Sequence, residues 1–410
     1  MNKLPLLAAS LFLLVVPHAV VAEPTPIAWG GWGFLAPSDQ VGQLAPNIVK
    51  AGELDPEMAD QLSLRLQRSL ESALLQRQDL RFVPAGADYL QDSYVLFFSV
   101  ISDYVDYRRV DEVAVEIYTI EAAVLVVNVS QQNSRQRIVN NIPVSVKYAT
   151  VQDPNQTPEG RARIFARMLV NPGPAEEMED IVAKWTDEAS KLQIREKSVW
   201  LRVAPVELSP SARELLQQYA SNADQARVIE QLPYRAASTL EWQVAKGLNI
   251  PVVPFGASSA SQKLVLSISD RRATIDFKPP AADRSMILVV DELRFIETSQ
   301  VSQSATANRG QTFAARFLFR VVDGEETKDR EAILLELPLK SVQSDLFARD
   351  KELDVPQEFG RLIALAGRDV GEAFAKADGK WFEQARSAQE QRKPKEVEKA
   401  VKQLRNKFIQ

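Results

Sequence analysis

The spacing of apolar residues in the first half of the chain predicts a helix followed by a buried strand. Apolar side chains recur every four residues from Met58 to Leu74, the spacing of a helix with one buried face. Asp55 and Pro56 are favourable residues for the start of that helix. The run at 94–107 begins with consecutive apolar residues, so we expect a central strand that is covered on both faces.

The second half of the chain has the same order of apolar segments. Leu240, Val244 and Leu248 repeat the helical spacing, and the apolar run at 286–296 predicts the second central strand. A closing helix is predicted by Phe359, Ile363, Ala366, Val370 and Phe374.

A long hairpin is predicted after each central strand. In the first half the runs 113–129 and 138–148 flank a polar tip. In the second half the runs 313–322 and 332–339 flank Asp323-Gly324, a dipeptide that favours tight turns.

Short motifs also recur, and they indicate an internal duplication. Val83-Pro84-Ala85-Gly86 recurs as Val253-Pro254-Phe255-Gly256, and Lys184-Trp185 recurs as Lys380-Trp381. Self-similarity of this kind is typical of tandem modules.

Each half is expected to open with a strand, at 27–35 and 199–208, and Leu35-Ala36-Pro37-Ser38 aligns with Leu208-Ser209-Pro210-Ser211 without a gap. An insertion at 261–282 in the second half predicts an extra strand near 264–268.

These patterns together predict an α+β fold of two tandem similar modules, each an antiparallel sheet with a long hairpin and helices packed on one face. The expected boundaries are residues 23–195 and 196–386. Residues 387–410 form a basic stretch with a narrow apolar stripe, which predicts an amphipathic helix at the C-terminus.

Residues 1–22 are typical of a secretory signal peptide. Lys3 precedes an apolar run that is too short to span a bilayer, and small residues precede Glu23. We therefore expect export to the periplasm with cleavage after Ala22.

The amino-acid composition limits the kinds of catalytic and metal site that the chain can form. The chain of 410 residues has no cysteine, and its one histidine, His18, lies in the expected signal peptide. This excludes Ser-His-Asp and Cys-His nucleophiles, zinc sites built on those residues, and lipidation on cysteine. We expect no cofactor, and the net charge of −5 does not favour a nucleic-acid partner. Carboxylate-only chemistry stays open.

Two segments are candidate sites. Trp29, Trp32 and Phe34 lie in a glycine-rich run that could contact a partner or a sugar through its rings, or could simply seal the first strand onto the core. Asp103 and Asp106, with Asp111 and Glu112 nearby, could form an acid pair or a Ca²⁺ site, or could be solvated charges at the end of a strand.

The order of these segments resembles a known envelope module. Leu66 to Leu74 running into Arg81-Phe82-Val83-Pro84, the strands at 94–107 and 286–297, and the turn at Asp323-Gly324 carry the resemblance. They are similar to the amino-terminal domain of the TolB translocation protein, to curli secretion-channel lipoproteins and to auxiliary lipoproteins of phospholipid-transport ABC systems. The resemblance implies a non-enzymatic docking role in the envelope. Those relatives commonly carry a lipidated cysteine and a single module, and this chain departs from both features.

The predicted function is that of a non-enzymatic periplasmic accessory or scaffold protein of an envelope transport, secretion or assembly complex. Its partner would be an outer- or inner-membrane protein, with a possible membrane-surface contact through the basic tail. Two alternatives stay open. One is a carboxylate-dependent hydrolase of cell-wall glycan that uses Asp103 and Asp106, and the other is a carrier of a lipid or small molecule between the modules.

Overall fold

The fold is described from a computed structural model of the chain. The residues described are 23–35, 41–83, 93–110, 113–129, 137–153, 155–173, 178–192, 194, 200–221, 223–248, 252–253, 262–268, 271–277, 282–299, 308–324, 332–348, 354–385 and 394–409. The expected signal peptide therefore lies outside the described residues.

Two mixed sheets form the framework of the molecule. Sheet A has seven strands in the order β10-β9-β1-β3-β4-β5, with β2 also paired to β1. Its strands are β1 (Thr25–Phe34), β2 (Leu80–Val83), β3 (Ser93–Val110), β4 (Val113–Val129), β5 (Arg137–Val151), β9 (Gln262–Ile268) and β10 (Arg271–Phe277). Sheet B has six strands in the order β13-β12-β11-β6-β8, with β7 also paired to β11. Its strands are β6 (Leu201–Val203), β7 (Glu207–Leu208), β8 (Val252–Val253), β11 (Arg284–Ser299), β12 (Asn308–Asp323) and β13 (Ile333–Ala348).

The described helices form two layers and a C-terminal element. The first layer contains α1 (Val41–Leu44), α2 (Pro46–Leu54), α3 (Met58–Leu74), α4 (Pro158–Val170) and α5 (Ile181–Ser190). The second contains α6 (Pro210–Gln218), α7 (Ala223–Leu248), α8 (Val355–Lys376) and α9 (Gly379–Ala385), followed by α10 (Pro394–Ile409). None of the described helices combines the length and apolar character that crossing a membrane requires.

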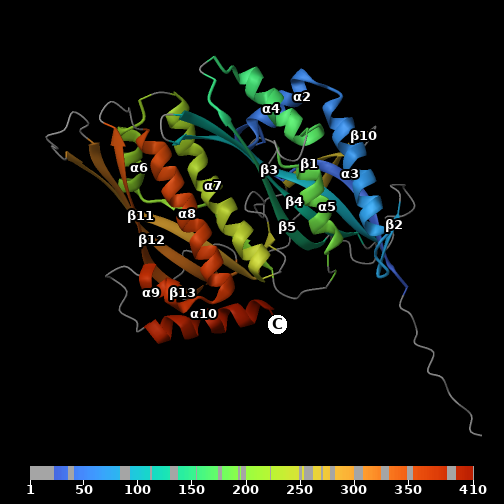
Figure 1. The fold of residues 1–410 in the computed structure, drawn as a ribbon. Helices are drawn as coiled ribbons and strands as arrows, with labels where there is room; N and C mark the ends of the chain where they lie inside the picture. Colours follow the sequence, from blue (N-terminus) through green and yellow to red (C-terminus); the bar gives the residue numbers. More distant parts are fainter. Residues whose placement is uncertain are drawn as a thin grey trace, which may run out of the picture.

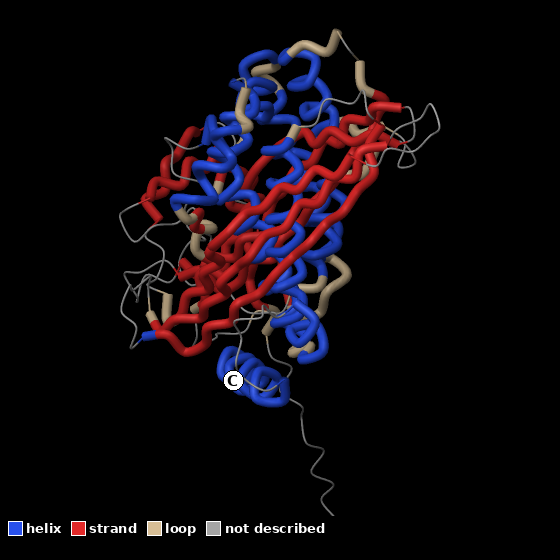
Figure 2. Tube along the Cα trace, turned by 90° about the vertical axis from the view of Figure 1, so that its left-hand side faces the viewer, coloured by secondary structure: helices blue, strands red, loops and turns tan. Residues whose placement is uncertain are grey.

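The layers alternate across the molecule (Figure 1). Helices α2 to α5 cover one face of sheet A, and α7 packs on the opposite face, with α7 and α8 in turn covering sheet B. Figure 2 shows the long strands running side by side as one slanted layer with helices against it. The strand β3 was expected to be apolar on both faces, and it is: Leu96 and Phe98 face α3 and α5, whereas Val95 and Phe97 face the core shared with α7.

The α+β class is confirmed, with two refinements. The long strands pair antiparallel, but β1 runs parallel to β3, and β6 and β7 run parallel to β11. Each sheet is therefore mixed, because helices return the chain to the same end of the sheet between these strands. Sheet A is also covered on both faces, since the second half of the chain supplies α7.

The two sheets share the same register irregularities. A bulge in β3 between Val100 and Ser102 has its counterpart in β11 between Val290 and Glu292. A second register shift follows Val126 in the first hairpin and Val321 in the second. Counting from these bulges, each position in the first hairpin has an equivalent in the second.

Equivalent positions also agree outside the hairpins. Ile27 of β1 pairs with Phe82, next to Val83, and Leu201 of β6 pairs with Val252, next to Val253. This is the match expected from the two Val-Pro-x-Gly motifs. The domain boundaries themselves, and a common origin of the halves, stay predictions.

Two expectations for the second half need correction. The strand expected at 199–208 is split into β6 and β7, with Pro205, which cannot donate a ladder hydrogen bond, in the gap between them. In addition, Val100 pairs with Phe34 and the equivalent Val290 pairs with Leu208, so Phe34 and not Leu35 corresponds to Leu208.

The insertion of the second half forms a hairpin, β9 and β10, where one strand was expected. Its position is the larger surprise, because β9 joins sheet A by pairing antiparallel with Trp32 and Gly33 of β1. A strand from the second half therefore extends the sheet of the first.

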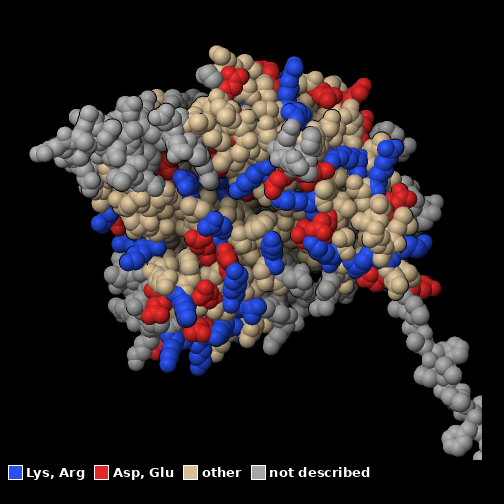
Figure 3. All heavy atoms as spheres, in the orientation of Figure 1, with Lys and Arg blue, Asp and Glu red and all other residues tan. Residues whose placement is uncertain are grey.

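The expected C-terminal helix is present as α10, and its apolar stripe is already occupied. Val397, Val401 and Leu404 are buried in the core that includes α7, α8 and α9. Arg405 donates through Nε to the carbonyl of Ala375 at 2.6 Å. Charged side chains of both signs lie at this end of the molecule (Figure 3), and the exposed face of α10 includes Lys395, Lys399, Lys402 and Lys407.

Candidate functional site

The aromatic residues of β1 lie in the core of the first half. Trp29 is 4% and Trp32 is 5% exposed, and Phe34 is half-buried. The Trp29 ring meets Trp185 edge to face with centroids 5.7 Å apart. Trp32 donates through Nε1 to the carbonyl of Ala59 at 3.0 Å. The rings therefore pack against α3 and α5.

The equivalent residues in sheet B give the same picture. Val203 pairs with Met286 as Trp29 pairs with Leu96, so Val203 is the equivalent of Trp29. Counting along the strand, Val206 is the equivalent of Trp32. Both valines are buried. Partner binding through Trp29, Trp32 and Phe34 stays a prediction, and any partner would meet little of either indole.

The two glycines between these tryptophans have structural roles. A Cβ on Gly30 would lie 2.1 Å from Cε1 of Phe97, so the Phe97 ring occupies that space. Gly31 has a φ of 103°, which side-chain-bearing residues rarely adopt, and it lies at the bulge where the pairing of β1 with β3 shifts.

The two acids proposed as a catalytic pair lie on opposite faces of sheet A. Asp103 contacts α2, and Asp106 contacts α7. Side chains alternate along a strand, so residues an odd number of positions apart face opposite sides. These two carboxylates therefore cannot flank one substrate. Asp111 and Glu112 lie outside the described residues.

Asp103 supplies the N-terminal cap of α2. Ala45, which precedes the helix, has no side chain that can cap it. The Asp103 carboxylate instead accepts from the backbone N–H of Ile48 at 2.7 Å and of Asn47 at 3.3 Å, and from the Asn47 side-chain amide at 2.6 Å. Burial raises the pKa of Asp103 to about 7, although these hydrogen bonds oppose the rise.

Asp106 belongs to a polar contact between the two halves, which we call the seam. Arg235 of α7 donates through Nη2 to Asp106 Oδ1 at 2.6 Å. The Arg235 guanidinium also lies 4.0 Å from the centroid of the Tyr104 ring. Burial raises the pKa of Tyr104 well above its usual value, so this phenol keeps its proton and donates to Glu121 at 3.3 Å.

Further contacts continue the seam across strands β4 and β5. Glu121 accepts from Ser102 Oγ at 2.7 Å and from Ser238 Oγ of α7 at 2.6 Å. Asn141 of β5 donates through Nδ2 to Glu241 Oε1 at 3.0 Å and to the carbonyl of Val252 at 3.2 Å. Helix α7 thus binds three neighbouring strands through one polar stripe.

A cleft of about 470 Å³ opens beside the seam, and we call it the seam cleft. Arg235, Thr239, Trp242 and Gln243 of α7 line it together with Arg361, Ala364, Leu365 and Arg368 of α8. Sheet A contributes Tyr104, Asp106, Glu121, Ser145 and Lys147, α5 contributes Lys184, and Glu179 lies just before α5. Figure 3 shows charged side chains of both signs along the boundary between the two halves.

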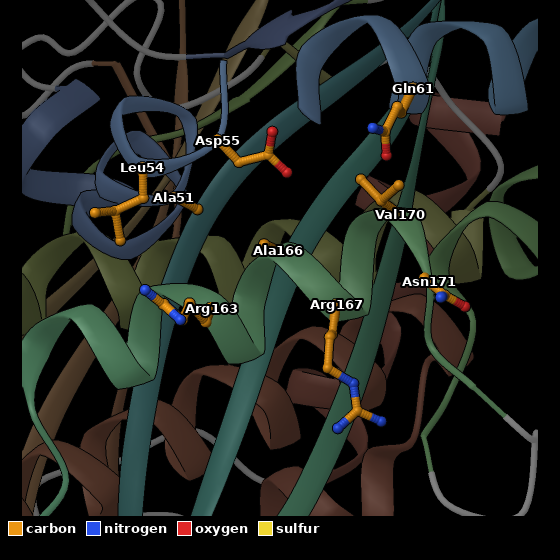
Figure 4. Close-up of a pocket in the computed structure, with 9 residues that line it drawn as sticks. All are labelled: Ala51, Leu54, Asp55, Gln61, Arg163, Ala166, Arg167, Val170 and Asn171. Carbon is orange, nitrogen blue, oxygen red and sulfur yellow. The ribbon is translucent and has the colours of Figure 1, made fainter. Parts of the chain in front are cut away.

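A second pocket, of about 430 Å³, lies in the first helix layer (Figure 4). It is lined by Ala51, Leu54, Asp55, Gln61, Arg163, Ala166, Arg167, Val170 and Asn171. Figure 4 shows the Arg167 side chain extending away from Leu54 and Asp55, so the charged groups of this pocket do not converge on one point.

Sequence reasoning missed the seam cleft because its lining comes from six elements that are far apart in the chain. The one local signal is on α8, where Arg361, Ala364, Leu365 and Arg368 follow helical spacing and so share a face. Within the described ranges, no group of three or more acidic, histidine or cysteine side chains is arranged to hold a metal ion.

No protein-family model matches the chain, and no curated protein matches its sequence. Among solved structures, that of a minor lipoprotein from Acinetobacter baumannii aligns with 47% of this chain and 96% of its own, at 10% identity and a TM-score of 0.19. A TM-score this low does not indicate a shared fold. The resemblance to the TolB and secretion-lipoprotein superfamily therefore stays a prediction.

Proposed function

We propose that this protein is a non-enzymatic accessory or scaffold protein of the bacterial cell envelope, exported to the periplasm. It acts by docking to a transport, secretion or assembly complex that contains an outer- or inner-membrane protein. The export signal expected at residues 1–22 supports the location, and the absence of cysteine together with the position of His18 supports a role without nucleophilic catalysis.

The observation that carries the proposal is how the carboxylates between the halves are used. Asp106, Glu121 and Glu241 each accept hydrogen bonds across the seam. Glu241 is buried, and Asp106 and Glu121 are half-buried. A carboxylate that protein donors hold in this way serves the structure, because its acceptor capacity is used within the protein. These acids join two sheets and two helix layers into one body, which is what a scaffold requires.

Photo-crosslinking in cells tests the docking role. A photoreactive residue would replace Leu54 on the first helix layer or Val342 on the outer face of sheet B, which are 40% and 60% exposed. We expect at least one of these two positions to crosslink reproducibly to a single envelope protein. A buried position, Leu66, is the matched control, since its side chain is fully covered. Absence of any adduct specific to the exposed positions contradicts the proposal.

The hydrolase alternative makes the opposite prediction. Purified protein would then release fragments from peptidoglycan without a partner. Because Asp103 and Asp106 lie on opposite faces of sheet A, they could not act on one substrate together, and Asp103→Asn or Asp106→Asn would abolish the release only where that acid acts with another group. We expect no release from the unmodified protein. Turnover that depends on either carboxylate would replace docking with catalysis.

A further inference from the structure

The seam cleft has features of a ligand site that docking to a protein does not require. We propose that it binds a small organic phosphate, a phosphate ester with an apolar or aromatic portion. This site goes beyond the scaffold role and does not depend on it.

The charge of the lining is the first argument. Five cationic side chains, Lys147, Lys184, Arg235, Arg361 and Arg368, line the cleft beside three carboxylates, Asp106, Glu121 and Glu179. The carboxylates are already engaged: Asp106 pairs with Arg235, Glu121 accepts from Ser102 and Ser238, and Glu179 pairs with Lys184 at 3.0 Å. The cleft therefore keeps a positive excess, which concentrates anions.

The cations lie on two walls. Lys147 of β5 and Lys184 of α5 belong to the first half, and Lys184 is held in place because it donates to the carbonyl of Ser145 at 3.1 Å. Arg361 and Arg368 belong to α8 of the second half. Arg361 lies 3.7 Å from Glu358, and Arg368 pairs with Asp369 at 2.8 Å; neither of these two acids is among the residues that line the cleft. A bound anion would thus be contacted by both halves at once.

Lys147 is the cation of the cleft whose side chain is most clearly available to an anion. Its backbone N–H donates to Glu179 Oε2 at 2.8 Å, which fixes the main chain and leaves the side chain exposed. Across the residues that the structure describes, no carboxylate pairs with the Lys147 ammonium. An unpaired ammonium at the mouth of a cationic cleft is a natural contact for an anionic oxygen.

The geometry favours phosphate over a lone carboxylate. A phosphate dianion presents oxygens in several directions and can accept from both walls, whereas a planar carboxylate accepts mainly in its own plane. The cleft volume of about 470 Å³ also leaves room for more than the anion itself. Trp242, Tyr104, Ala364 and Leu365 supply aromatic and apolar surface for the rest of the ligand.

Binding of two probes tests the site. Phenyl phosphate, an ester with an aromatic portion, reports on a free phosphate ester by calorimetry, and phosphatidylcholine vesicles containing phosphatidylglycerol report on a lipid headgroup by co-sedimentation. The test variant combines Lys147→Ala with Arg368→Ala. The matched control combines Arg163→Ala with Arg167→Ala, which removes the same charge from the pocket of Figure 4.

We expect the seam variant to weaken binding by about tenfold or more for each cation removed, since hydrogen bonds between charged groups are of that strength. The control should bind within about twofold of the unmodified protein. Binding of phenyl phosphate alone identifies a free ester as the source, and binding to the vesicles identifies a headgroup.

Three results overturn the proposal: no binding of either probe to the unmodified protein, unchanged binding by the seam variant, or equal loss in the control. Lys147 and Arg368 are exposed, so the fold should persist, and thermal unfolding checks this. Should the double variant be unstable, Arg368→Gln alone gives the same test at one position.

Discussion

Sheet A and sheet B have equivalent faces, but a helix covers this face in sheet A and none of the described helices covers it in sheet B. The face of sheet A formed by Val95, Phe97 and Ala123 is buried under α7. The equivalent face of sheet B has no helix of the described chain on it, and Val342 there is 60% exposed. Only toward the start of β11 does this face hold a small buried cluster, formed by Ala204, Ile287 and Val322. The same sheet therefore serves once as an internal layer and once as an outer surface.

Charge substitution at equivalent positions explains the difference. Leu125 pairs with Asn141 in sheet A, and the equivalent pair in sheet B is Arg320 with Glu336, which form a salt bridge at 2.7 Å. These charges pair across the strands and stay in contact with water, so the face is stable without a cover. In stacked modules, a terminal unit with a polar outer face ends the stack in this way.

The edge strands show a second shared device. Pro143 lies in β5 opposite Ala123, and Pro338 lies in β13 opposite Leu318, which are equivalent positions. Proline has no N–H to donate, so each long edge strand is interrupted as a template for another strand. Docking by addition of a strand is therefore disfavoured at the middle of both edges.

The sharpest way to break this comparison is to place a charge on each face. Ala123→Arg would bury a cation against α7, so we expect a loss of about 3–5 kcal/mol in the free energy of unfolding. Leu318→Arg, at the equivalent half-exposed position, should change it by less than about 1 kcal/mol. Urea unfolding of both variants measures this. Similar losses would mean that the outer face of sheet B is also covered in solution.

The faces illustrate what the sequence could and could not reveal. The apolar run at 94–107 predicts a strand covered on both sides, because burial leaves a local signature in each residue. The sequence cannot say that α7, more than a hundred residues later, supplies the second cover, and the pairing of β9 with β1 is equally non-local. The seam cleft is hidden for the same reason, since Lys147 and Arg368 line one cleft only in the folded chain.

Local chemistry was also ambiguous where two functions need the same residue types. Tryptophans such as Trp29 and Trp32 suit both a docking surface and a core, and it is their burial and their contacts with α3 and α5 that place them in the core. Asp103 and Asp106 appear as a pair in the sequence, but the alternation of the strand separates them.

A second comparison concerns the repeated tryptophans. Trp185 is completely buried and meets both Trp29 and Phe98 edge to face, whereas Trp381 is half-buried beside Phe382. We expect Trp185→Ala to cost about 3–5 kcal/mol and Trp381→Ala about half as much, since less surface and a smaller cavity are involved. Thermal and urea unfolding give the values. A larger effect at Trp381 would mean that the α9 region contributes more to stability than its exposure indicates.

The buried acid of the first half has an apolar equivalent in the second. Counting from the shared bulge, Asp103 corresponds to Leu293, and the second half instead caps α6 locally through Ser209, which accepts from the N–H of Ala212 at 3.1 Å. The cap of α2 should therefore make stability depend on pH in one half only.

The sign follows from the raised pKa. The folded state holds a proton on Asp103 up to about pH 7, whereas the unfolded chain releases it near the ordinary aspartate pKa of 3.8. The stability that this proton contributes is complete below about pH 4 and is lost as the pH rises through 7. We expect the free energy of unfolding to fall by about 2–4 kcal/mol between pH 4 and pH 8.

Unfolding of Asp103→Asn over the same range checks this. The variant should lose most of the slope, whereas Asp55→Asn, at an exposed carboxylate beyond the end of α2, should keep it. A slope that survives in Asp103→Asn would assign the pH dependence to another group.

The smallest expected effect concerns how closely α8 approaches α7. A Cβ on Gly367 would lie 2.8 Å from the carbonyl oxygen of Ala236, a backbone atom that cannot move aside alone. A Cβ on Gly360, on the same helix, would meet nothing closer than 3.8 Å. Gly367→Ala should therefore destabilise the protein by about 1–3 kcal/mol. Gly360→Ala should stabilise it by up to about 1 kcal/mol, because alanine loses less backbone entropy in a helix.

Since α7 also covers sheet A, the Gly367 variant should loosen the seam as well, which faster amide hydrogen exchange in β4 and β5 would report. Unchanged exchange there would mean that α7 follows sheet A rather than α8, and that the covered face is held independently of the second helix layer.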